Sequence, residues 1–121
     1  MTRKIMAVDD DPDQLAIFDS LLRDEGFAIE TATSGFEALE KVKHSRPDLI
    51  LLDVSMPKMN GFTLCHELKK HPASASIPIL MVTGMHGTFT KLNSMAHGAD
   101  GYLAKPFKPE ELIASVNKLL G

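Results

Sequence analysis

Five short apolar runs occur in this sequence, and some of them lack the alternation of polar and apolar residues expected of a half-exposed strand. The clearest is Leu49–Leu52, four leucine or isoleucine residues in a row. Strands without alternation are buried on both faces, which is typical of a parallel sheet covered by helices on both sides. We therefore expect strands at Lys4–Val8, Phe27–Thr31, Leu49–Asp53, Ile79–Val82 and Gly101–Ala104.

Segments with helical spacing and clear start signals separate these runs. Asp11-Pro12 fits an N-cap followed by proline in the first turn, and Ser34–Glu37 fits a capping box. Asn60-Gly61 precedes a third helix, and Pro109–Glu111 opens the last one. A strand followed by a helix about five times predicts an α/β domain, residues 1–121, with a doubly wound parallel sheet in three layers.

The composition excludes several classes of protein. The 121 residues are 44% hydrophobic and 24% charged, and the net charge of −3 offers no basic surface for nucleic acid. No apolar run approaches the roughly 20 residues that cross a bilayer, and the basic start is too short for a signal peptide. The single cysteine, Cys65, fits a reducing compartment and is expected in the core. We expect a cytoplasmic domain that binds neither nucleic acid nor membrane.

Acidic residues stand where two of the expected strands end. Asp9 and Asp10 follow the first strand, and Asp53 ends the third. Ligands of open α/β sheets bind outside the carboxyl ends of the strands, so these carboxylates converge if the strands are neighbours. Their repulsion favours a cation among them, and such oxygen ligands suit Mg²⁺. Each acid alone is more often a turn or cap residue, as we expect for Asp11, but burying three together without a purpose is costly.

Two further side chains reach the same edge of the predicted sheet. Thr83 ends the fourth strand and Lys105 follows the fifth. Alone, a threonine in a strand reflects β propensity, and a lysine is usually a solvated charge. Beside acids and a metal ion, a hydroxyl and an ammonium group are the parts of a phosphoryl-transfer site.

Along essentially its whole length, the sequence resembles the receiver domain of two-component response regulators, including the chemotaxis regulators. The matching pieces are VDDD with Asp9 and Asp10, LLDVSMPKMNG with Asp53, MVTG with Thr83, and GYLAKPF with Tyr102 and Lys105. Each piece is weak alone, but all of them in order, each at the end of its own strand, are a specific signal. The resemblance implies a flavodoxin-like fold with five helices and strand order 2-1-3-4-5.

The resemblance also implies a role for each residue at the acidic edge. Asp53 would accept a phosphoryl group from the phosphohistidine of a sensor histidine kinase or a histidine phosphotransfer protein. Asp10, Asp53 and the backbone carbonyl of Ser55 would bind Mg²⁺ directly, and Asp9 would act through water. The domain would modify itself and slowly hydrolyse its own phosphate, so it would not be an enzyme acting on an external metabolite.

Three residues would link the phosphate to an output surface. Lys105 would pair with phosphate oxygens, Thr83 would hydrogen-bond to one of them, and Tyr102 occupies the family's aromatic switch position. Phosphorylation would change the surface formed by the fourth helix, fifth strand and fifth helix. A downstream effector domain or partner protein would bind there. The Lys105-Pro106 peptide bond is often cis in this family.

Two other classes of protein share parts of this pattern. A flavodoxin-type electron carrier needs a phosphate-binding loop after the first strand, where the acids of DDDPDQ would repel a phosphate. A phosphatase of the haloacid dehalogenase type needs a second aspartate two residues after the nucleophile, where this chain has Ser55. A coloured protein or turnover of a phosphate ester would favour these alternatives.

Some features point to no specific role. The last helix lacks the basic spacing typical of receivers that dimerise beside winged-helix DNA-binding domains, which argues against that subclass. Ser55 and Met85 lie two residues past Asp53 and Thr83, where the family sets its hydrolysis rate, but they indicate no clear rate. The histidines show no metal-binding spacing and are expected on the surface, with His86 near the rim of the site.

Overall fold

The computed structural model describes residues 2–84 and 88–121, and it contains one parallel five-stranded sheet with the strand order β2-β1-β3-β4-β5. The fold class and strand order expected from the sequence are confirmed. The strands are β1 (Lys4–Val8), β2 (Ala28–Ala32), β3 (Leu49–Leu52), β4 (Ile79–Thr83) and β5 (Gly101–Ala104). The helices are α1 (Pro12–Asp24), α2 (Gly35–Ser45), α3 (Gly61–Lys70), α4 (Thr88–Ala96) and α5 (Pro109–Leu120).

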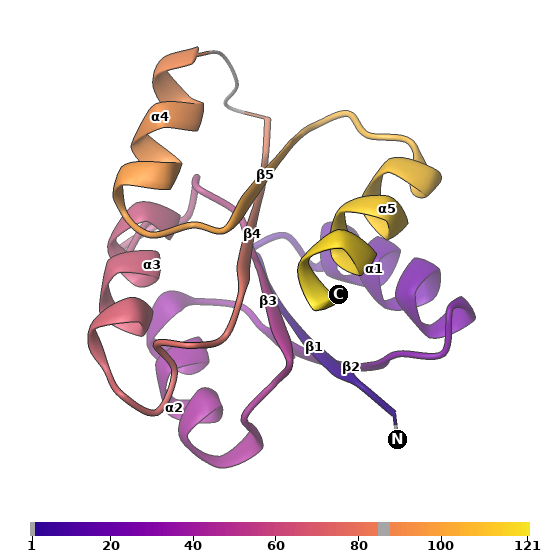
Figure 1. The fold of residues 1–121 in the computed structure, drawn as a ribbon, viewed down its shortest axis with the longest axis horizontal. Coiled ribbons are helices and arrows are strands. Elements are labelled where there is room, and N and C mark those ends of the chain that lie inside the picture. Colours follow the sequence, from indigo (N-terminus) through magenta and orange to yellow (C-terminus); the bar gives the residue numbers. More distant parts are fainter. Residues whose placement is uncertain (1, 85–87) are drawn as a thin grey trace.

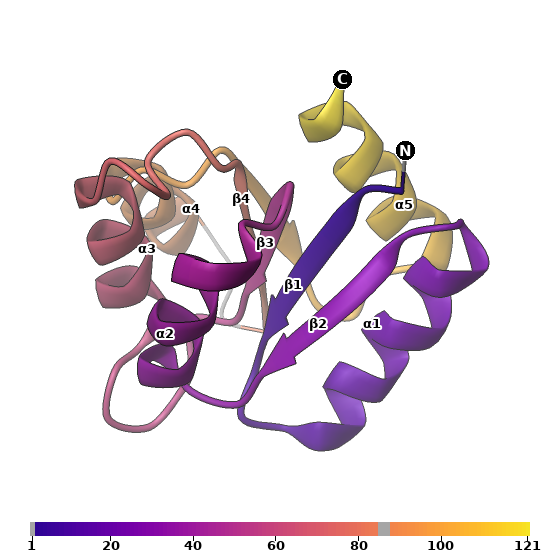
Figure 2. The same cartoon turned by 90° about the horizontal axis from the view of Figure 1, so that it is seen from below.

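Helices cover both faces of the sheet and form a three-layer domain (Figure 1). Helices α2, α3 and α4 lie on one face and α1 and α5 on the other (Figure 1). Figure 2, in which β1 and β2 run between the two groups of helices, shows the same division. Each face buries its own apolar cluster. β3 and β4 are buried along their whole length, as their sequences predict, whereas the edge strand β5 is only partly buried. Among the described residues, the helices are too short or too polar to span a bilayer.

The predicted start signals open three of the helices. The Asp11 side chain accepts a hydrogen bond from the Asp13 amide at 3.0 Å, so Asp11 is a cap and not a site residue. Ser34 accepts from the Glu37 amide at 3.1 Å. The Asn60 side chain caps α3 by accepting from the Thr63 amide at 3.0 Å. These caps set where each helix begins, and hence where each strand-to-helix loop must turn.

Four strand boundaries differ by one residue from the expected ones. β2 begins at Ala28 and ends at Ala32, β3 ends before Asp53, and β4 includes Thr83. At β2 the reason is local, because the Phe27 amide donates to the Leu22 carbonyl at 3.1 Å and still closes the end of α1. Such backbone bonds between elements are not encoded in hydrophobic periodicity.

Gly61, the first residue of α3, lies against the backbone of the β3–α3 loop. Its amide donates to the Val54 carbonyl at 2.9 Å. A β-carbon at this position would clash with the Asp53 carbonyl oxygen and lie 2.8 Å from the Val54 α-carbon. Only glycine permits this close approach, which holds the loop after Asp53 against the start of α3.

We predict that Gly61→Ala destabilises the fold by about 1–3 kcal/mol, because its new methyl group would have to displace backbone and not a flexible side chain. Gly84→Ala is the matched control, since a β-carbon there meets no atom of the described residues within 4 Å. Urea unfolding of both variants measures the difference. Equal stability of Gly61→Ala and the wild type would contradict the close approach.

Candidate functional site

Backbone hydrogen bonds continue one residue past three strands and fix the chain at the predicted site. The amides of Asp9, Asp53 and Lys105 donate to the last carbonyl of β2, β1 and β4 at 3.1, 3.2 and 2.9 Å. The backbone position of each of these residues is therefore fixed relative to the end of the neighbouring strand. The Lys105-Pro106 peptide bond is cis, as the family resemblance implies.

The three predicted carboxylates converge at this edge. One oxygen from each of Asp9, Asp10 and Asp53 lies within 4.8 Å of the other two. The Asp9 side chain is only 2% exposed and Asp53 is 11% exposed, whereas Asp10 is exposed to solvent. An acid cluster of this kind can hold a metal ion, and oxygen ligands with open positions for water and phosphate suit Mg²⁺.

Lys105 brings a positive charge to the acids. Its Nζ lies 3.4 Å from Asp9 Oδ2 and 4.0 Å from Asp53 Oδ2, and its side chain is 22% exposed. The ammonium group thus bridges the two carboxylates and leans toward Asp9. It lies close enough to Asp53 to contact an oxygen added to that carboxylate.

Burial is the main influence on the ionisation of Asp9. It raises the pKa of the carboxyl group above its ordinary value, and the nearby charge of Asp53 acts in the same direction. A hydrogen bond from the Asp11 amide at 3.0 Å and the charge of Lys105 lower the pKa and only partly oppose burial. The charged form of Asp9 is therefore costly in the folded protein, and an additional cation would relieve that cost.

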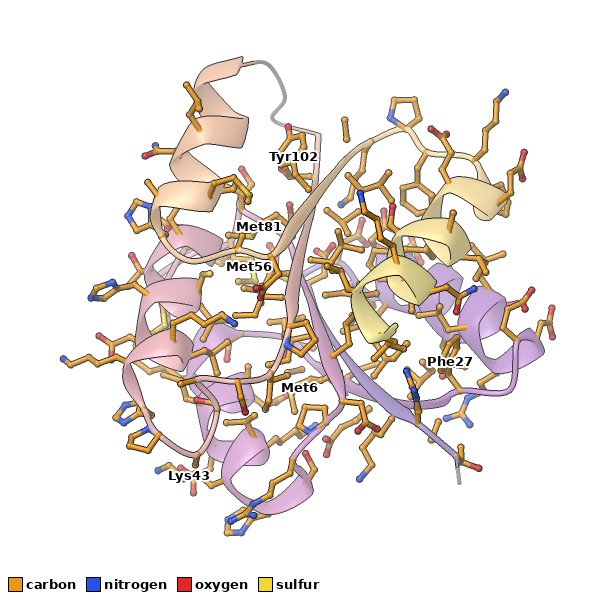
Figure 3. All side chains as sticks on the ribbon, in the orientation of Figure 1. Met6, Phe27, Lys43, Met56, Met81 and Tyr102 are labelled. Atoms are coloured by element: carbon orange, nitrogen blue, oxygen red, sulfur yellow. The ribbon has the colours of Figure 1, made fainter. Side chains whose placement is uncertain are left out.

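Thr83 and Tyr102 lie on the same face of neighbouring strands. Thr83 is fully buried at the end of β4. Met81 pairs with Tyr102, and alternation places the side chains of Met81, Thr83 and Tyr102 on one face. The Tyr102 ring is partly buried, and burial raises the pKa of its phenol. Figure 3 shows this ring near the carboxyl end of β4, on the side of the sheet where α3 and α4 lie.

The loop after β3 turns back toward the Asp53 carboxylate. The Ser55 amide is 3.4 Å from Asp53 Oδ1, which makes a long hydrogen bond, and the Ser55 side chain is exposed. Sequence reasoning placed Ser55 at the metal only through its carbonyl, which stays a prediction. It missed Gly61, whose close contact with this loop shapes the site; the Asn60-Gly61 pair was the available signal.

Several other sequence predictions have clear outcomes. Cys65 is buried in the core, as expected, and burial raises the pKa of its thiol to about 11. His44, His66 and His71 are exposed, while His97 is partly buried. The expectations for Met85 and His86 lie outside the described residues.

Comparison with known proteins identifies one family. The response regulator receiver domain family matches residues 5–117. The DNA-binding response regulator MtrA of Mycolicibacterium smegmatis is 41% identical over 120 residues, which are 99% of this chain and 51% of that protein. The transcriptional regulatory protein PhoP of Bacillus subtilis, named for alkaline phosphatase synthesis, is 38% identical over 99% of this chain and 49% of its own length. The chain thus spans about half the length of these curated relatives.

Solved structures give the same result. The chemotaxis protein CheY4 of Vibrio cholerae superposes with a TM-score of 0.94 at 36% identity, covering 98% of this chain and 99% of that one. A putative response regulator of Chloroflexus aurantiacus gives a TM-score of 0.93 at 37% identity over 99% and 98% of the two chains. MtrA is named as a DNA-binding regulator and PhoP as a transcriptional one, whereas the expectation from the last helix of this chain, against the subclass with winged-helix domains, stays a prediction.

We predict that Asp9→Asn raises the melting temperature at neutral pH in the presence of a chelator, because it removes a buried charge. The folded-state pKa of Asp9 is raised above its ordinary value of 3.8, so the destabilisation by its charge is absent below that value. The destabilisation by the Asp9 charge grows as pH rises from 3.8 through the raised pKa, and above the raised pKa it is complete. The gain from Asp9→Asn should therefore shrink as pH falls toward 4. Thermal melts across this range test it, with the exposed Asp13→Asn as a control that should show no such gain.

Proposed function

The chain belongs to the response regulator receiver domain family, and we propose that it is a switch activated by phosphorylation of Asp53. The observation that carries this proposal is the setting of the Asp53 carboxylate. It is partly accessible, it has Lys105 Nζ at 4.0 Å, and it shares an oxygen cluster with Asp9 and Asp10. A nucleophile flanked by a fixed cation and a candidate metal site is what phosphoryl transfer requires.

The reaction is an attack by a carboxylate oxygen of Asp53 on the phosphorus of a phosphohistidine. The phosphorus–nitrogen bond breaks, the imidazole leaves, and an acyl phosphate forms on Asp53. Asp10, Asp53 and the Ser55 carbonyl would hold Mg²⁺ directly, with Asp9 contributing through water. The ion supplies positive charge against the phosphoryl oxygens when it is bound.

Lys105 and Thr83 would stabilise the product. The Lys105 ammonium already lies between two carboxylates, so it can pair with a phosphate oxygen on Asp53 without leaving the site. The Thr83 hydroxyl lies at the end of the adjacent strand β4 and would donate to another oxygen. Water would slowly hydrolyse the acyl phosphate, so the domain is not an enzyme acting on a separate substrate.

The partners follow from this chemistry. The donor would be a sensor histidine kinase or a histidine phosphotransfer protein, and the receiver of the signal would be an effector domain or a separate protein. Leu92 and Met95 on α4 are 64% and 48% exposed, which supports an apolar contact on the α4–β5–α5 surface. The receiver itself is proposed to bind no nucleic acid.

The acceptor assignment predicts that Asp53→Asn abolishes phosphorylation. The protein is incubated with Mg²⁺ and acetyl phosphate, and the modified residue is mapped by mass spectrometry. Asp48→Asn is the matched control, because Asp48 is an exposed acid just before the same strand and should leave the yield unchanged. A normal yield from Asp53→Asn would refute the assignment.

The switch itself depends on the shared face of Thr83 and Tyr102. Phosphate on Asp53 adds negative charge and acceptor oxygens that draw the Thr83 hydroxyl toward it. Movement of Thr83 frees space on the face where the partly buried Tyr102 ring lies. We infer that phosphorylation shifts an existing equilibrium toward an inward Tyr102, with a coupling of about 1–3 kcal/mol.

We predict that Thr83→Ala permits phosphorylation but uncouples it from the surface. Amide NMR spectra with beryllofluoride as the phosphoryl mimic should show shifts over residues 88–120 in the wild type and much smaller ones in the variant. Wild-type shifts confined to the loops around Asp53 would contradict the switch, as would a Tyr102 ring that keeps one rotamer in both states.

A further inference from the structure

A histidine of α3 and a histidine just past α4 lie side by side, away from the acidic edge. His66 belongs to α3 and His97 directly follows α4. Their ring centroids are 6.5 Å apart, with the ring planes at 82°. His66 is exposed and His97 is partly buried, so the pair is open to solvent on one side.

The His97 ring is held in one orientation. Its Nδ1 lies 2.8 Å from the Asn93 carbonyl oxygen. A carbonyl oxygen only accepts hydrogen bonds, so Nδ1 carries the proton, and the lone pair of the neutral ring is on Nε2. The ring also packs on Phe62 at a centroid distance of 5.3 Å. The His97 carbonyl accepts a hydrogen bond from Cys65 Sγ at 3.3 Å, which fixes the backbone as well.

This arrangement is typical of a histidine that binds a metal ion. Ligating histidines usually donate their other ring N–H to a carbonyl or carboxylate, which fixes the tautomer and makes the free nitrogen a better ligand. A tetrahedral ion with two imidazole nitrogens at about 2.0–2.1 Å separates the ring centroids by about 5–6 Å. The observed 6.5 Å is slightly longer, so the exposed His66 side chain would have to move toward His97 for both rings to bind one ion.

We propose that His66 and His97 form a binding site for a late first-row transition-metal ion such as Zn²⁺, with His97 Nε2 as the preorganised ligand and water completing the coordination. The site differs from the acidic cluster in chemistry as well as in place. Imidazole nitrogens favour Zn²⁺ and Cu²⁺, whereas carboxylate oxygens favour Mg²⁺. The bound ion joins α3 to the end of α4, two elements that are 31 residues apart at these positions.

Zinc titrations of the intact chain test this site, with excess Mg²⁺ present to occupy the acidic cluster. Calorimetry should show one Zn²⁺ bound per chain, and amide NMR should place the shifts at the end of α4 and the facing turn of α3. His66→Gln should weaken binding by about ten-fold or more, because one ligand of a chelating pair is lost. His97→Phe should do the same while keeping an aromatic ring against Phe62.

His71→Gln is the matched control. His71 is an exposed histidine just past the end of α3, with Nε2 3.9 Å from a carboxylate oxygen of Glu67, and its loss should leave the Zn²⁺ affinity unchanged. Wild-type affinity in His66→Gln would overturn the proposal, and this exposed position is not expected to affect folding. Zinc-induced shifts confined to the amides around Asp9 and Asp53 would overturn it too.

Discussion

The pairing of β1 with β3 is the constraint on which the site depends. Val8 lies opposite Leu52, so both strands end at the same level and the acids that follow them must meet. The ladder then extends one further step, because the Asp53 amide donates to the Val8 carbonyl. The site is therefore positioned by the sheet and not by flexible loops, which is how functional groups are held within small tolerances.

This convergence opposes the stability of the domain. Three carboxylates gather at this edge, and one lysine lies near two of them. One of the carboxylates, Asp9, is almost wholly buried. The energetic penalty makes the edge attractive to a divalent cation, since binding of the cation relieves repulsion that already exists. Functional sites commonly retain such unfavourable interactions at the expense of stability. Here the same repulsion would favour metal binding beside Asp53, which is partly accessible.

Much of this could be predicted from the sequence, for identifiable physical reasons. The unalternating run at Leu49–Leu52 encodes burial on both faces, and the caps at Asp11 and Ser34 encode helix starts. The strand order came from resemblance alone, because periodicity does not specify which strands are neighbours. The boundaries moved by one residue where backbone bonds join separate elements, as at Phe27.

Features that depend on tertiary distance were not predictable in this way. Lys105 lies closer to Asp9 than to Asp53, a difference of side-chain placement that spacing along the chain does not carry. The contact of His66 with His97 was also not predictable, because spacing along the chain does not show side chains that come together from separate elements. Residues of separate elements that lie close together in space can be recognised only once the fold is known.

The central strands of the sheet are more deeply buried than the edge strand β5, which favours β5 as the place where the proposed conformational change reaches the surface. β3 and β4 are buried along their full length, so a change of side-chain position there disturbs a close-packed core. β5 is partly buried throughout, and Tyr102 has a phenol group whose burial is unfavourable in its charged form. Movement at this strand costs less than movement inside the sheet. In the proposed switch, a small displacement of Thr83, which shares the face of Tyr102, would therefore be transmitted toward the neighbouring strand β5.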